Sequence, residues 1–127
     1  WPNTAAGLTG IQTIVPLMLD HVSAGRLSLP RLADLMGTGP ARVYGALTKG
    51  RLAVGYDGDV TVVDMKRQRK IEDSWIVSPC GWTPFAGHRC TGWPAMTIIR
   101  GNVVMREDEV LGTPIGAPVA FADTARE

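Results

Sequence analysis

The chain has 127 residues, 45% of them hydrophobic, and a formal net charge of +1. This length and apolar fraction are enough for one domain with a buried core. A charge so close to zero gives no general attraction to nucleic acid or to an acidic lipid surface. The longest apolar run, Thr13 to Leu19, is too short to cross a bilayer, so we expect neither nucleic acid nor membrane as a partner.

The cysteine count bears on the cellular compartment, and the first residue bears on whether the chain is part of a longer polypeptide. Cys80 and Cys90 are too few for a disulfide framework, and two free thiols are favoured over a single bridge. Free thiols suit a reducing cytoplasm, which is the expected location. The chain opens on Trp1 in a stretch typical of a loop, and we expect it to be a piece of a longer polypeptide.

The first third has a helical pattern. Thr9 followed by Gln12 predicts a capping box at the start of a first helix, in which the two side chains satisfy orphan backbone amides. Apolar residues at spacings of four, three and four then predict one apolar stripe. Its members are Ile11, Val15, Met18 and Val22.

Two further short helices are expected before residue 48. Ser28 is a suitable cap for one helix, with Pro30 in its first turn and Gly37 at its end. Thr38 is a suitable cap for the next, again with a proline, Pro40, in the first turn.

After Gly50 the pattern changes to that of strands. Residues 60–63 form a β-branched run, and residues 96–100 and 103–105 flank Gly101-Asn102, which predicts a hairpin with a type II′ turn. Residues 72–93, rich in Trp, Pro, Gly and Cys, predict a packed loop with one short helix. The tail from Gly112 should be loose, with Val119 and Phe121 able to dock.

Several blocks resemble, in order, the carboxyl-terminal part of one family, the metal-dependent amidohydrolases. Residues 6–13 (AGLTGIQT) resemble the segment after the last barrel strand in dihydroorotases and hydantoinases. Residues 39–45 (GPARVYG) resemble a later helix entry, and residues 49–64 resemble the start of the small β domain. Residues 81–87 (GWTPFAG) and 96–105 are similar to a loop and a closing hairpin of that domain. The sequences of residues 11–13 (IQT) and 81–85 (GWTPF) resemble dihydroorotases more than hydantoinases.

The resemblance implies an α/β fold: the carboxyl-terminal part of a metal-dependent (βα)8-barrel enzyme, with the last barrel helices followed by part of a small β-sandwich. Residues 1–48 would be the active-site loop and last helices, and residues 49–127 the sandwich and tail. The remaining barrel, in the same polypeptide, would be the partner that the helices cover.

The implied activity is the reversible hydrolysis of the cyclic amide of dihydroorotate to carbamoyl aspartate in pyrimidine synthesis, with one or two zinc ions activating water. The zinc ligands and the catalytic aspartate of the family have no counterpart here and would lie upstream, so no catalytic or metal-binding residue is expected in this chain. Only Ala6 and Gly7 match the substrate loop, as backbone contacts, and Ala5 stands where the family usually has proline.

The other candidate chemistry has a simpler explanation in each case. His21 and His88 lack partners at zinc-ligand spacing, as do the cysteines. The aspartates fit turns, the basic run 66–70 fits a solvated hairpin rather than a phosphate contact, and the tryptophans fit loop packing rather than a stacking platform. These groups are Asp57, Asp59 and Asp64, and Trp75, Trp82 and Trp93.

Two alternatives to a dihydroorotase stay open. One is a dihydroorotase-like protein without metal ligands that acts as a scaffold for a partner such as aspartate transcarbamoylase. The other is a hydantoinase or allantoinase. Family members are commonly homodimers. Alone, the chain would expose its helical stripe and a sheet edge, and we expect it not to be an autonomous enzyme.

Overall fold

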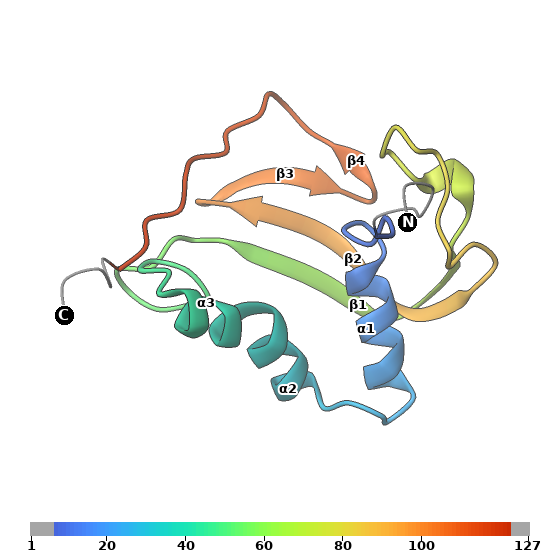
Figure 1. Ribbon diagram of the computed structural model, residues 1–127, viewed down its shortest axis with the longest axis horizontal. Coiled ribbons are helices and arrows are strands. Elements are labelled where there is room, and N and C mark those ends of the chain that lie inside the picture. Colours follow the sequence, from blue (N-terminus) through green and yellow to red (C-terminus); the bar gives the residue numbers. More distant parts are fainter. Residues whose placement is uncertain (1–6, 123–127) are drawn as a thin grey trace, which may run out of the picture.

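The computed structural model describes residues 7–122, which form a small antiparallel sheet with helices packed along one side (Figure 1). The helices are α1 (Ile14–Ser23), α2 (Leu29–Ala33), the π-helical segment η1 (Asp34–Thr38), α3 (Gly39–Tyr44) and the 3-10 turn η2 (Asp73–Trp75). The strands are β1 (Val60–Lys70), β2 (Arg89–Ile99), β3 (Asn102–Arg106) and β4 (Glu109–Val110).

The sheet has the order β1-β2-β3-β4, with every neighbouring pair antiparallel. The long strands β1 and β2 pair over most of their length, with register shifts between Val62 and Val63 and between Asp64 and Gln68. At the second shift Asp64 accepts hydrogen bonds from the amides of Lys66 and Arg67, at 2.9 and 3.2 Å. Its side chain therefore caps the irregularity, a local role of the kind predicted for it.

Helix α1 packs on β2. Leu19, 1% exposed, sits over Gly92, whose φ is +103°; a Cβ there would lie 2.7 Å from that of Leu19. Leu17 reaches the main buried cluster, which consists of Ile71, Cys90 and Trp93. The helix thus approaches the sheet closely because one strand residue has no side chain.

The predicted helices are present, but their ends and faces differ from the expectation. Helix α1 begins at Ile14, its cap Thr13 makes no capping hydrogen bond with its side chain, and its buried residues are Pro16 and Leu19. Ile11 is 96% exposed and lies before the helix. The predicted capping box was wrong, because Thr9 and Gln12 bond to a distant loop instead. Of the predicted stripe, Val15, Met18 and Val22 lie in α1 and are half-buried.

The second and third helices form one continuous run. Ser28 caps α2 as predicted, accepting from the Arg31 amide, and Pro30 lies in the first turn. Gly37 does not end this helix, because η1 carries the chain directly into α3. Thr38 donates its hydroxyl to the Gly50 carbonyl at 2.7 Å rather than capping α3.

Two predictions about the sheet are corrected. The turn between β2 and β3 is Arg100-Gly101, with φ of 45° and 79°; two positive values indicate type I′ rather than type II′, and Asn102 pairs with Ile99. The basic run 66–70 is the second half of β1, not a hairpin loop. Arg67 and Arg69 pair there with Glu107 and Asp108 of the β3–β4 turn.

The loop and tail predictions are confirmed. Residues 72–88 are irregular apart from η2, although Arg89 to Trp93 belong to β2. The tail runs back from β4 to the end of α3, where Phe121 forms a bridge with Ala46 (Figure 1). No helix within residues 7–122 is long and apolar enough to span a bilayer.

Candidate functional site

The first described residues form the entry segment, residues 7–13, which leads into α1. Gly7 has φ +90°, a conformation that L side chains rarely adopt, and no atom within 4 Å would meet a Cβ there. A Cβ at this position would therefore point into open space. Ala6, the other predicted contact, lies outside the described residues.

The entry segment is bound to the aromatic loop, residues 72–88 between β1 and β2. The Gln12 carboxamide donates to the Trp75 carbonyl at 2.6 Å and accepts from the Val77 amide at 3.0 Å. The Thr9 hydroxyl donates to the Trp82 carbonyl at 3.0 Å. Residues more than 60 positions apart in the chain are thus joined by three hydrogen bonds.

The aromatic loop is in turn bound to the sheet through Asp108. One carboxylate oxygen accepts from the indole nitrogens of Trp75 and Trp93, at 3.2 and 3.1 Å, and the other pairs with Arg69. The two tryptophan rings lie 4.8 Å apart between centroids, and the Arg69 guanidinium lies 4.8 Å from the Trp93 ring centroid. These two tryptophans pack as predicted, but Trp93 does so from a strand.

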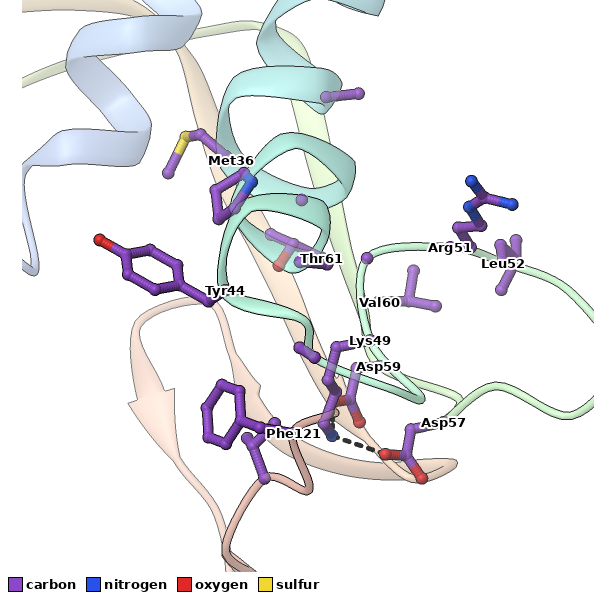
Figure 2. A pocket seen from close by; sticks show the side chains of 17 residues that line it. Met36, Tyr44, Lys49, Arg51, Leu52, Asp57, Asp59, Val60, Thr61 and Phe121 are labelled. Atoms are coloured by element: carbon purple, nitrogen blue, oxygen red, sulfur yellow. Dashed lines mark hydrogen bonds and ion pairs between the residues drawn. The ribbon is translucent and has the colours of Figure 1, made fainter. Parts of the chain in front are cut away.

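A second candidate site is a cavity of about 730 Å³ between α3, the start of β1 and the tail (Figure 2). Its polar centre is Lys49, whose Nζ lies 2.9 Å from Asp57 Oδ2 and also pairs with Asp59. Tyr44 and Phe121 contribute apolar walls.

The charged groups of this cavity are occupied with one another. Thr48 donates to Asp57 at 2.8 Å, and the Arg100 amide donates to Asp59, also at 2.8 Å. Hydrogen bonds from Lys49 chiefly lower the pKa of both carboxyl groups, and the same bonds raise the pKa of Lys49. All three are therefore charged at neutral pH, and they are poor general acids or bases. Their geometry supports the predicted structural role of Asp57 and Asp59.

The cysteines are free, as predicted. Cys80 is exposed in the aromatic loop, where hydrogen bonding with Ser78 lowers the pKa of its thiol. Cys90 is buried, and burial raises the pKa of its thiol to about 11. They lie in different surroundings and form no common site.

The histidines lie at the exposed end of α1. His21 Nδ1 accepts from Arg26 Nε at 2.7 Å, and His88 Nε2 lies 3.5 Å from Asp20 Oδ2. Within residues 7–122 no three His, Cys, Asp or Glu side chains are grouped so that they could hold a metal ion. The described residues therefore do not fit a zinc centre.

Sequence reasoning missed Asp108 and the true partners of Gln12. The local signal for Asp108 was its place in a turn, where aspartate tolerates its φ of +70°. Gln12 carried a misleading signal, because a glutamine three residues after a threonine also fits a helix cap.

The sequence profile of the amidohydrolase family matches residues 6–104, which is most of the chain. The chain belongs to the amidohydrolase family. This confirms the resemblance derived from the motifs. The match includes the entry segment, the aromatic loop and strand β2, so the hydrogen bonds of Thr9 and Gln12 to the loop lie within the matched part, whereas Asp108 lies beyond it.

Several relatives of this amidohydrolase chain are named dihydroorotase. That of Pyrococcus furiosus is 46% identical over 112 residues, which are 88% of this chain and 27% of the relative. That of Bacillus licheniformis is 38% identical, over 83% of this chain and 24% of the relative. The chain thus spans about a quarter of the length of the relatives it matches.

Solved structures show the same fold. The L-hydantoinase of Arthrobacter aurescens superimposes with a TM-score of 0.82 and 39% identity, over 86% of this chain and 25% of that one. The D-hydantoinase of a Thermus species gives a TM-score of 0.78 at 28% identity. The predicted fold class, part of an amidohydrolase with mixed helix and sheet, is confirmed.

Proposed function

We propose that the amidohydrolase chain is part of a dihydroorotase, which interconverts dihydroorotate and carbamoyl aspartate in the cytoplasm. The observation that carries this is the 46% identity to a dihydroorotase across 88% of the chain, with further dihydroorotases at 42% and 38%. The identity extends over most of the chain, so it rests on more than the family's short motifs.

In this proposal residues 1–48 are the substrate loop and last helices of a barrel, and residues 49–127 are a small β domain and tail. The rest of the polypeptide supplies the catalytic groups and one or two zinc ions, since residues 7–122 hold no metal cluster. Ala6 and Gly7 contribute backbone groups. The positive φ and open surroundings of Gly7 support this role, because a carboxylate or ring carbonyl can come close to bare backbone.

The test is turnover by the full-length protein. We expect ring opening of dihydroorotate, loss of activity after chelation and recovery with zinc. In the same preparation, Gly7→Ala should weaken substrate binding, because a Cβ is strained at φ +90°. Zinc-loaded, folded protein that leaves dihydroorotate untouched would overturn the proposal.

A hydantoinase is the second candidate, favoured by the 39% identity and TM-score of 0.82 to the L-hydantoinase. Hydantoin and dihydroorotate both carry a cyclic amide, but only dihydroorotate carries a carboxylate on the ring. Parallel assays therefore separate the two: faster opening of a hydantoin or of allantoin would assign the chain to that class. If the protein opens no cyclic amide and binds no metal, the remaining candidate is the non-catalytic scaffold.

A further inference from the structure

The Gln12 side chain joins two segments as a backbone peptide group would, because its carboxamide has both a donor and an acceptor. Its amide donates to one backbone carbonyl of the aromatic loop and its oxygen accepts from an amide two residues later, at 2.6 and 3.0 Å. Only a side-chain carboxamide of this length supplies both bonds: glutamate lacks the donor and methionine lacks both groups.

The helix gives up its own cap for this contact. Thr13, at the cap position of α1, makes no capping hydrogen bond with its side chain, whose hydroxyl donates to the Gly10 carbonyl at 3.3 Å, and the two residues suited to a capping box reach across to the loop. Backbone bonds from Thr13 and Ile14 to the Gly10 carbonyl, at 3.1 and 2.9 Å, close the turn that holds Gln12. The position of the entry segment is therefore set by the aromatic loop as well as by α1.

The loop is itself fixed to the sheet. Trp75, whose carbonyl receives the Gln12 bond, donates its indole N–H to Asp108 and packs against the fully buried Trp93. At the base of the loop, backbone bonds join Ile71 to Gly87 and His88, each at 2.9 Å. A continuous set of contacts thus leads from the core of the sheet to the segment that contains Gly7.

We propose that Gln12 is a positioning residue. By bonding the entry segment to the aromatic loop, it holds the Gly7 backbone in the place where that backbone contacts the substrate. The inference rests on the proposed function, in which the backbone at Gly7 contacts substrate. Gln12 touches no reacting atom; it acts through the main chain five residues upstream. Its loss should weaken binding in ground and transition state alike, and so raise KM more than it lowers kcat.

The test uses the full-length protein with Gln12→Met, which keeps the side-chain length and removes both bonds. We expect KM for dihydroorotate to rise about tenfold while kcat falls less than about threefold. The matched control is Ser23→Ala. Ser23 also ties α1 to the sheet, by a 2.9 Å bond to the Thr91 carbonyl, but at the end of the helix remote from Gly7. Its KM should stay within about twofold of wild type.

A second variant and a second readout guard against a misfolded protein. Thr9→Val removes the other side-chain bond between the two segments and should raise KM in the same direction. Hydrogen exchange at the Val77, Thr13 and Ile14 amides should accelerate in Gln12→Met and not in Ser23→Ala. Unchanged KM in both entry-segment variants, or an equal rise in Ser23→Ala, overturns the inference.

Failure of the proposed function gives a different result. In that case wild type does not open dihydroorotate, and the KM measurement is made with the hydantoin or allantoin that the protein does open. If it opens none, exchange decides: acceleration confined to Gln12→Met supports the mechanical coupling, and unchanged exchange overturns it.

Discussion

Asp108 shows how one side chain can join several elements. It stands in the β3–β4 turn, yet its carboxylate meets Arg69 from β1, Trp75 from η2 and Trp93 from β2. The carboxylate is 18% exposed, so its partners are shielded in part from water. Bonds between a charged acceptor and donors in such surroundings are stronger than those on an open surface.

Replacing Asp108 should therefore destabilise the protein, by an amount that depends on whether the new side chain still offers an acceptor to the partners of Asp108. Asp108→Ala leaves two indole N–H groups and a guanidinium without their acceptor, and we expect a loss of about 2–3 kcal/mol in the free energy of unfolding. Asp108→Asn keeps a neutral acceptor and should lose about 1 kcal/mol. Urea unfolding followed by tryptophan fluorescence measures both.

The control for Asp108 is its neighbour in the same turn. Glu107 pairs with Arg67, but its side chain is 55% exposed, so Glu107→Gln should change stability by less than about 0.5 kcal/mol. Equal effects at the two positions would show that the contacts of Asp108 with the two indoles contribute nothing to stability.

At the scale of elements, the contact between α1 and β2 fixes the position of α1 on the sheet, and with it the point where the entry segment joins the helix. The helix lies close to the strand at Gly92, and polar groups at its carboxyl end bond to Thr91. Packing and hydrogen bonding thus act on neighbouring residues of one strand, which sets both the distance and the position of the helix along β2.

Gly92→Ala should separate these elements. The added methyl would lie 2.7 Å from the Leu19 Cβ, at a φ of +103° that alanine rarely adopts. We expect a loss of about 2–3 kcal/mol in the free energy of unfolding, from overpacking and backbone strain together. Gly116→Ala, where nothing lies within 4 Å and φ is not in the left-handed region, is the control. A difference below about 0.5 kcal/mol between the two in thermal or urea unfolding would contradict this account.

Asp20 gives the same contact a dependence on pH. A hydrogen bond from the Thr91 amide at 3.0 Å, with His88 and Arg26 nearby, holds the pKa of Asp20 below its usual value. A depressed pKa in the folded state means that the stabilisation is present above the unfolded pKa and is lost as pH falls through the folded one.

The variant Asp20→Asn keeps an acceptor for Thr91 but cannot titrate. Wild type should therefore be the more stable protein at pH 6, and the difference should shrink toward zero as pH falls through the lowered pKa of Asp20. Chemical denaturation of both proteins at a series of pH values measures it. A difference that is constant with pH would rule out the charge as its source.

At the scale of the whole molecule, much apolar surface is uncovered. Val43 and Leu47 are more than half exposed, as are Leu8 and Ile11 in the entry segment. Exposed apolar area of this kind is typical of a surface that another part of a protein covers. The length of the relatives agrees, because this chain spans only about a quarter of them.

We expect the 127-residue chain, prepared alone, to associate and to show no activity toward dihydroorotate. Sedimentation velocity at increasing concentration should show growing oligomers, whereas the full-length protein should give one discrete species. A stable, dispersed monomer of the isolated chain would contradict the expectation, and turnover by it would contradict the proposal that the catalytic groups lie elsewhere.

Local patterns were sufficient for the presence of the helices, the main strands and the Ser28 cap, because neighbouring residues dominate each of these features. The cysteine count was sufficient for the free thiols. They failed wherever a side chain had a choice of partners. Thr9 and Gln12 fit a helix cap, yet bond to carbonyls 73 and 63 residues away. Arg67 and Arg69 read as a solvated loop, yet pair across the sheet. Such choices depend on which segments the folded chain brings together. The spacing of residues along the sequence carries no information about the distance in space between segments that lie far apart in the chain.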